Sequence, residues 1–220
     1  MIARHYRHDA EEPGYLTFVQ SRADDEQSMS HNAFDGDERR MDTLSGHLDW
    51  SITDSLSFSA KTYMNHIDDQ RWVTFAAASS QQERVTNERH KGYLTSLTWR
   101  PQVNFLHKFA LEVGYNQEWQ DNESERYRTV ERIRAAKTRD QQFDFDTKGG
   151  YVQAIIQPLD ALKFVPAYRV DRVDGDYTNH LTGISYNINR YGSIEQPKFS
   201  TVWTPIEGYS HSLIQSQSIQ

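Results

Sequence analysis

Residues 44–64 read LSGHLDWSITDSLSFSAKTYM and alternate in character on both sides of a short polar break. The mainly apolar positions are Leu44, Gly46, Leu48, Trp50 and Ile52 before the break and Leu56, Phe58, Ala60, Thr62 and Met64 after it. A period of two is that of a β-strand, whose successive side chains point to opposite faces of a sheet. Because the break at Thr53-Asp54 is short and polar, residues 41–64 are predicted to form an antiparallel β-hairpin.

The same design recurs three times further along the chain. Alternation predicts hairpins over residues 92–116, 150–170 and 197–218. Their turns are placed around Arg100-Pro101, at Gln157 to Asp160 and at Thr204 to Gly208, and the last departing run, Tyr209 to Ile219, is the weakest. Pro166 stands inside the third hairpin, where a bulge or local distortion is expected because proline cannot donate a hydrogen bond to the strand ladder.

The segments between the hairpins are long, polar and charged. They cover residues 65–90, 120–148 and 171–195, and residues 11–40 look similar, although Tyr15 to Val19 could add a short strand. Loops longer than about 12–15 residues are uncommon in compact soluble domains. Short turns that alternate with long loops are typical of the periplasmic and outer sides of outer-membrane barrels. The predicted fold is therefore all-β: an antiparallel up-and-down transmembrane barrel segment with short periplasmic turns and long extracellular loops.

The composition agrees with a barrel whose lumen is filled with water, and it argues against several other classes of protein. Hydrophobic residues make up 36% and mean hydropathy is -0.83, yet aromatic residues reach 12%, which is unlike a disordered chain. With 24 basic and 31 acidic residues the net charge is -7, so no nucleic-acid partner is expected. The absence of cysteine excludes disulfides and thiolate zinc sites. No run of 18 apolar residues appears, and Met1 to Ala10 lacks the apolar region of a secretory signal, so the chain is expected to begin inside a larger protein.

Aromatic residues gather near the predicted strand ends. Trp50, Trp99 and Trp203 lie next to short turns, whereas Tyr63, Trp72 and Trp119 lie toward the long connections. Girdles of aromatic residues at both membrane interfaces would produce this placement. The alternative is the general preference of Trp and Tyr for strands.

Several motifs now resemble those of a known family. They are Gly150-Tyr151-Val152-Gln153-Ala154, Gln157-Pro158-Leu159-Asp160-Ala161-Leu162-Lys163, Tyr168-Arg169-Val170-Asp171, Gln196-Pro197-Lys198-Phe199, Val202-Trp203-Thr204-Pro205, Pro13-Gly14-Tyr15-Leu16-Thr17 and Gln70-Arg71-Trp72-Val73-Thr74-Phe75. Their order resembles the barrel of TonB-dependent receptors across most of residues 1–209. The resemblance implies an outer-membrane receptor that imports a ferric siderophore or similar scarce nutrient, energised through a TonB complex.

The chain also departs from that family. It shows no plug domain and no TonB box, and it offers about 8–9 predicted strands where about 22 are needed. Its end, Ser210 to Gln220, lacks an aromatic last residue. Residues 1–220 are therefore expected to be one piece of a receptor barrel, contacting outer-membrane lipid and unable to transport alone, because unpaired strand edges are costly in a bilayer.

Candidate chemistry is sparse. His5 and His8 are the only closely spaced histidines, and a strand would place them on opposite faces, so no metal site is expected. Residues 171–176 lack the ligand pattern of a calcium loop and are expected to be a polar turn, and the acidic pairs Asp24-Asp25 and Asp68-Asp69 are expected to be solvated. No nucleophile elbow, P-loop or dinucleotide motif occurs, so neither an enzyme nor a cofactor is expected.

The segment Gln70-Arg71-Trp72 is the one candidate ligand site. An arginine beside an aromatic ring suits an anionic, aromatic-bearing chelate through charge and stacking, so Arg71 and Trp72 are predicted ligand-binding residues in an extracellular loop. Packing against a neighbouring loop is the alternative. For the whole chain, the competing class is a soluble β-sandwich that binds carbohydrate, in which alternation buries one face and aromatic rings stack on sugars.

Overall fold

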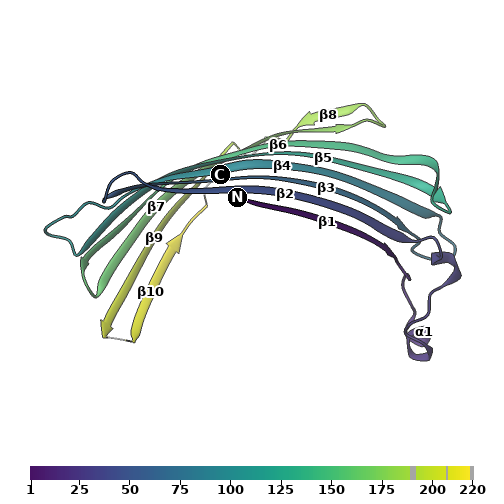
Figure 1. Cartoon of the computed structure of the whole chain (residues 1–220), viewed down its shortest axis with the longest axis horizontal. Coiled ribbons are helices and arrows are strands. Elements are labelled where there is room, and N and C mark those ends of the chain that lie inside the picture. Colours follow the sequence, from purple (N-terminus) through teal and green to yellow (C-terminus); the bar gives the residue numbers. More distant parts are fainter. Residues whose placement is uncertain (189–191, 207, 219–220) are drawn as a thin grey trace.

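The computed structural model describes residues 1–188, 192–206 and 208–218, and its strands form one antiparallel sheet (Figure 1). Its strand order is β1-β2-β3-β4-β5-β6-β7-β9-β10, with β8 paired to β7. The strands are β1 (Ile2–Glu11), β2 (Gly36–Ser51), β3 (Leu56–Val73), β4 (Gln81–Trp99), β5 (Lys108–Val130), β6 (Ile133–Leu159), β7 (Leu162–Asn179), β8 (Ile184–Asn187), β9 (Ser193–Ile206) and β10 (Tyr209–Ser216). The chain thus runs up and down through neighbouring strands. Because these strands form one sheet and not two packed sheets, the β-sandwich alternative is wrong.

The four predicted hairpins are confirmed. β2 pairs with β3, β4 with β5, β6 with β7 and β9 with β10, all antiparallel. The turn after β2 is held by Thr53, whose Oγ1 accepts a hydrogen bond from the Leu56 backbone at 3.1 Å. Residues 100–107 form a longer connection than the predicted tight turn. Within the last hairpin, Glu207 and Ile219 lie outside the described residues.

The polar segments predicted as loops are mostly strand, which is a correction. β3 and β4 continue to a seven-residue connection at 74–80, and β5 and β6 continue to a two-residue turn at 131–132. Apolar alternation fades in these segments because both faces of a projecting ribbon meet water, although the backbone ladder continues unbroken. The sheet therefore has a tip end, where these long hairpins turn, and a turn end at residues 52–55 and 160–161. With β1 and β8 it holds ten strands, against the 8–9 predicted.

The hairpin of β5 and β6 ends in a strained turn. Glu131 and Arg132 both have positive φ, 50° and 66°, as the central residues of a type I′ turn require. In non-glycine residues this conformation is destabilising, because Cβ comes too close to the following carbonyl oxygen. Contacts of Arg132 compensate, because its backbone N–H donates to Gln81 at 2.9 Å and its Nε donates to the Phe34 carbonyl at 3.0 Å.

The connection between β1 and β2 holds a short helix instead of the possible strand at Tyr15 to Val19. Helix α1 (Phe18–Ala23) begins at Thr17, which forms a capping box with Gln20. One turn of 3-10 helix follows at Ser30–Asn32. In the described part of the chain, neither helix has the length and apolar character needed to cross a membrane.

Pro166 interrupts the ladder locally, as expected. β6 and β7 pair at Gln153 with Ala167 and again at Ile156 with Phe164, so the pairing is broken across Pro166 without a change of register. The register shift itself lies nearer the turn, between Ile156 and Leu159.

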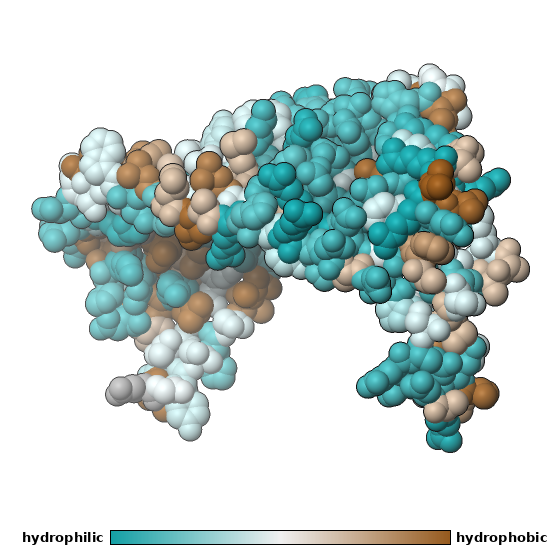
Figure 2. Space-filling model, turned by 45° about the vertical axis from the view of Figure 1, so that its right-hand side comes forward, coloured by the Kyte–Doolittle hydropathy of each residue, from teal (hydrophilic) through white to brown (hydrophobic). Residues whose placement is uncertain are grey.

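The sheet has two faces of opposite character. In the half nearest the turn end, one cross-strand row joins Trp50, Phe58, Leu97, Val113, Val152 and Tyr168, and this face is called the apolar face. The neighbouring row joins Asp49, Ser59, Ser96, Gly114, Tyr151 and Arg169, and this face is called the polar face. Figure 2 shows hydrophobic side chains gathered toward the turn end and hydrophilic ones over the tip half.

The apolar band has the height of a bilayer core. Along β5 it runs from Phe109 to Trp119 on one face. Ten residue steps of about 3.3 Å, tilted by about 40°, span roughly 25 Å, as in outer-membrane barrels. Within it Val113 is 51% exposed, which is costly in water and favourable in lipid. Phe109, Leu111, Val113 and Tyr115 thus lie on the apolar face of β5, and Glu112, Gly114 and Asn116 lie on its polar face.

The aromatic girdles are partly as predicted. Trp50, Trp99 and Trp203 lie on the apolar face near the turn end, and Trp119 marks the other edge of the band. Tyr63 instead lies on the polar face, opposite Gly92. Trp72 lies further out, near the tip end. Tyr93 and Tyr115 complete the second girdle. The ring centroid of Tyr93 lies 6.1 Å from that of Tyr115 and 6.0 Å from that of Trp119.

The polar face is tied across strands by side-chain hydrogen bonds. The Tyr151 hydroxyl donates to Glu112 Oε1 at 2.6 Å, and its ring lies so close to Gly114 that any Cβ there would collide with it. Arg169 donates to Asn116 Oδ1 at 2.8 Å and pairs with Asp171 at 2.6 Å. Polar groups that satisfy one another in this way are typical of a barrel interior.

Candidate functional site

The two predicted ligand residues lie at the tip end of β3, in a strand and not in a loop. As neighbours in a strand, Arg71 and Trp72 point to opposite faces of the sheet. They therefore do not form one stacking surface. Arg71 lies on the polar face, where its guanidinium pairs with Glu12 at 2.7 Å and stays 36% exposed.

Trp72 is buried, at 7% exposure, on the other face. The guanidinium of Arg132 lies 4.5 Å from its ring centroid, a cation–π contact. This corresponds to the packing alternative for the aromatic residue. Trp72 fixes the tip of the neighbouring hairpin, and Arg71 keeps a guanidinium directed toward the polar face.

A buried polar cluster joins the 12–35 connection to two hairpin tips. The Asp35 carboxylate is 1% exposed and accepts hydrogen bonds from the Thr74 backbone at 2.6 Å, the Thr74 hydroxyl at 2.8 Å, Asn32 at 2.7 Å and Gln81 at 2.9 Å. Gln81 in turn accepts from the Thr129 hydroxyl at 3.1 Å. A buried carboxylate is stable only when it is bonded in this way. The cluster therefore positions the tip end as a unit.

On the same side of the tip end, charges are paired. Glu83 is 1% exposed and receives both Arg134 Nε at 2.6 Å and Nη2 at 2.8 Å. Lys137 donates to Glu125 and to Asp140, each at 2.6 Å. Burial alone would raise the pKa of Glu125, but hydrogen bonds from Lys137 and Tyr127 outweigh it and lower that pKa. Hydrogen bonds from Asp140 and Glu125 raise the pKa of Lys137.

The polar face of the same strands carries a row of arginines. Register places Arg71 of β3 opposite Arg84 of β4, Arg84 opposite Arg126 of β5, and Arg126 opposite Arg139 of β6. Neighbouring strands lie about 4.8 Å apart, so the row spans roughly 15 Å. The sequence alone predicts Arg71 as a site residue, but it does not predict Arg84, Arg126 or Arg139. Nothing in the chain marks them locally, because only the register brings them together.

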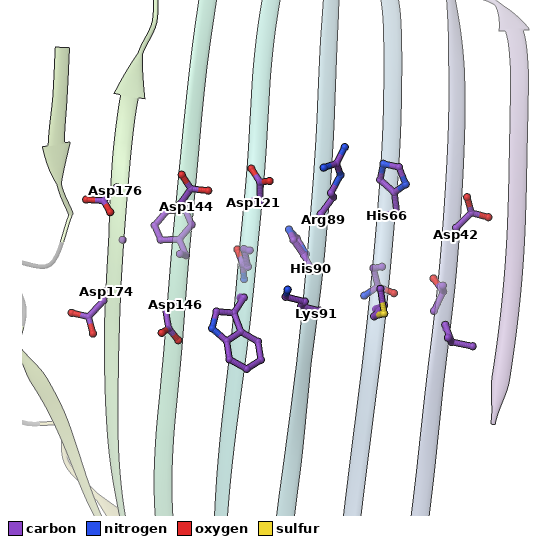
Figure 3. Close-up of a pocket in the computed structure, with 18 of the residues that line it drawn as sticks. Asp42, His66, Arg89, His90, Lys91, Asp121, Asp144, Asp146, Asp174 and Asp176 are labelled. Carbon is purple, nitrogen blue, oxygen red and sulfur yellow. The ribbon is translucent and has the colours of Figure 1, made fainter. Parts of the chain in front are cut away.

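A hollow of about 1340 Å³ lies across the middle of β1 to β7. Figure 3 shows residues that line it. By register, most of its labelled side chains lie on the same side of the sheet as the apolar face. They lie at the level of Trp119, where the apolar band ends. Most of its carboxylates lie on β5 to β7, namely Asp121, Asp144, Asp146, Asp174 and Asp176, with Asp42 on β2, whereas its basic groups lie on β1, β3 and β4, namely Arg4, His5, His66, Arg89, His90 and Lys91. Across residues 1–188, 192–206 and 208–218, no three His, Asp or Glu side chains gather in a metal-binding group.

The remaining candidates take ordinary structural places. His5 Nδ1 lies 2.6 Å from Asp42 in a pair across β1 and β2, and His8 lies on the other face of β1. Residues 171–176 lie within β7 and pair with β6, so the expected polar turn is wrong and no loop surrounds a cation there. Asp69 pairs with Arg39 at 2.7 Å.

Three solved structures that resemble this chain are a ferric citrate transporter, a siderophore receptor and a ferric-catecholate import receptor. The chain superposes on the unliganded ferric citrate transporter FecA with a TM-score of 0.82 at 15% identity, covering 94% of this chain and 31% of that one. The siderophore receptor PiuA from Acinetobacter baumannii gives 0.63 at 11%, covering 81% and 32%. The open form of the ferric-catecholate import receptor Fiu from E. coli K12 gives 0.61 at 13%, covering 83% and 36%. The chain thus spans about a third of each.

At these identities the structural likeness establishes the fold alone, and no curated protein matches the chain. The family itself is established by sequence. A model described as TonB dependent receptor-like, beta-barrel, matches residues 3–214, almost the whole described sheet. Together with the two-faced sheet of paired neighbours, this match shows that the chain belongs to the TonB-dependent receptor β-barrel family.

Proposed function

We propose that this chain forms part of the wall of an outer-membrane receptor that imports a ferric siderophore or a similar scarce nutrient, energised through a TonB complex. Family membership supports it, since members of this family are outer-membrane transporters and not enzymes. The solved relatives are a ferric citrate transporter, a siderophore receptor and a ferric-catecholate import receptor, and these favour a ferric chelate as the ligand class.

The observation that carries the proposal is the apolar face. Val113 is 51% exposed and lies between Leu97 and Val152, which are 42% and 39% exposed, with no second layer over them among the described residues. Leaving such a surface in water costs about 25 cal/mol for each Å². Lipid removes that cost, whereas the opposite face with Glu112 suits a wet lumen. An outer-membrane location follows for the proposed receptor.

Single cysteines test the facing directly, because the natural chain has none. Val113→Cys and the neighbouring Glu112→Cys would be labelled with a fluorophore in the full chain, reconstituted in phosphatidylcholine vesicles. Brominated acyl chains should quench the label at 113 strongly and the label at 112 weakly. Equal quenching would refute the lipid-facing band.

The chain is proposed to act as one wall domain, residues 1–220, and not as a pore. β1 and β10 each pair on one side only in the described sheet, so two edges stay open. Open edges leave backbone groups unsatisfied in lipid, at several kcal/mol each. Expressed behind an export signal in a strain lacking its siderophore receptor, the chain should not support growth on that siderophore. TonB-dependent growth would contradict this.

Arg71 and Trp72 keep distinct parts in the proposal. Arg71 lies on the polar face with 36% of its side chain exposed, where a ligand descending from the tip end would meet it. Trp72 supports that position from the opposite face through its contact with Arg132. An Arg71→Gln receptor should bind its chelate more weakly, whereas Trp72→Phe should change folding more than binding.

A further inference from the structure

The arginine row on the polar face is energetically unusual. Like charges directly opposite each other in neighbouring strands are destabilising. Arg84, Arg126 and Arg139 occupy three successive strands in this way. Within the described residues no carboxylate lies within 4.0 Å of any of these three guanidinium groups. Most arginines elsewhere on the sheet have such a partner: Arg39, Arg40, Arg71, Arg134, Arg169 and Arg172.

Two of the three arginines also keep a buried donor without an acceptor. Arg84 Nε and Arg126 Nε are both inaccessible to solvent and lack a hydrogen-bond partner among the described residues. Arg84 is held with its guanidinium 5.0 Å from the Phe75 ring centroid, which adds no acceptor. Burial, and then the charges of Arg139 and Arg84, lowers the pKa of Arg126. Such donors are rare and costly unless a ligand or an ordered water supplies the acceptors.

Arg126 and Arg139 line a cavity, whereas Arg84 lies on the neighbouring strand outside its lining. The cavity holds about 300 Å³ and is lined by Ser80, Gln82, Arg126, Arg128, Thr138 and Arg139. All six side chains are polar, and none is acidic. A β-bulge at the Arg126/Tyr127 step gives β6 one extra residue there, and the Thr138 hydroxyl donates to the Arg126 carbonyl at 3.2 Å. Bulges commonly re-aim side chains beside functional sites.

We propose that Arg84, Arg126 and Arg139 form a binding site for a small, multiply charged oxyanion, one that presents two or more carboxylate or phosphate groups. The inference rests on the proposed function and narrows its ligand to an anionic chelate. A planar guanidinium meets a carboxylate or phosphate through two parallel hydrogen bonds. Three of them spread over about 10 Å match separate anionic groups of one ligand. The cavity is at the lower end of small-molecule sites. Arg71, neutralised by Glu12, closes the row on β3.

The test uses the full chain in detergent micelles, titrated with citrate, inorganic phosphate and neutral glucose at constant ionic strength. Isothermal titration calorimetry and the thermal midpoint are both measured. Citrate should bind more tightly than phosphate and raise the midpoint, and glucose should do neither. The Arg126→Gln and Arg139→Gln variants should each lose about tenfold or more in citrate affinity. They should melt at or above the natural chain's midpoint in anion-free buffer, because repulsion is relieved.

Arg172→Gln is the matched control, since Arg172 is exposed, lies on the other face and pairs with Asp174 at 2.9 Å. Citrate affinity should be unchanged in it. Equal losses in all three variants would mean nonspecific attraction and would overturn the site. So would unchanged citrate binding in Arg126→Gln with only a raised midpoint, which is repulsion without a ligand. Adding dihexanoyl phosphatidylglycerol should not compete with citrate; competition would point to a lipid headgroup and against a soluble chelate. The quenching experiment does not depend on any of these results, so the two proposals fail separately.

Discussion

The two faces of the projecting hairpins carry charged side chains at the same level of the same strands. On one face these charges are paired, and on the other they are not. On one face Glu83 is buried and bonded twice by Arg134, and Lys137 joins Glu125 to Asp140. On the other face Arg84, Arg126 and Arg139 oppose one another without carboxylates. The first arrangement stabilises the ribbon. The second opposes folding through repulsion between like charges, as expected for the proposed anion site.

The largest expected effect concerns the turn-end continuation of these two faces. Val113→Arg should destabilise the sheet by about 2–4 kcal/mol, because a charge on the lipid face near the midplane is costly. Glu112→Gln on the polar face should be mild, since the Tyr151 hydroxyl can still donate to the amide oxygen. Urea unfolding in vesicles measures both. Equal losses would show that the faces are assigned wrongly.

The paired side of the tip is next in size. Glu83→Gln should cost about 2 kcal/mol, because the two bonds from Arg134 lose their charged acceptor. Glu123→Gln, at an exposed position of β5 on the same face, is the control and should change little. Urea midpoints compare the two variants. A Glu83 variant as stable as the control would mean that the paired network does not hold the tip.

A charge reversal tests the unpaired side. Arg84→Glu would place a carboxylate opposite Arg126, supplying the partner that the row lacks. The expected gain is small, about 0.5 kcal/mol, as for an opposite-charge cross-strand pair. Unfolding in anion-free buffer would measure it. A loss of stability instead would show that the row is not under electrostatic repulsion.

The smallest effect is a pH dependence. Because the pKa of Glu125 is lowered in the folded chain, its contribution to stability is present above its ordinary pKa of 4.5 and is lost as the pH falls through the lowered value. The natural chain should therefore lose more stability than Glu125→Gln between about pH 7 and about pH 3. Identical pH profiles would show that Lys137 does not bind the carboxylate.

Local pattern was enough for the hairpins but not for their length. Between Leu44 and Met64 one face of the sheet is apolar and the other is polar. Apolar and polar residues therefore alternate with a period of two in the sequence. Beyond Asn65 both faces meet water, so that signal vanishes while the strand continues to Val73. The same limit explains β1, whose charged residues carry no apolar alternation.

The site shows the limit more sharply. Arg71 could be predicted as a site residue because it neighbours Trp72 in the sequence. The prediction that both residues contact one ligand was wrong, because neighbouring residues of a strand point to opposite faces of the sheet. The partners of Arg71 in the row are Arg84, Arg126 and Arg139, and nothing local relates them. A one-residue slip of register would move any of them to the other face.

By itself, therefore, the sequence determined the fold class, the four hairpins, the two faces of the membrane-spanning half and the family. Those features depend on contrasts between neighbouring residues and on motifs within single hairpins. Only the tertiary structure decided that the polar connections are strands, that Trp72 is buried under Arg132, and that four arginines line one row. The reason is physical: register between strands is set by the backbone ladder and by turn geometry over the whole sheet, and no short window of residues contains it.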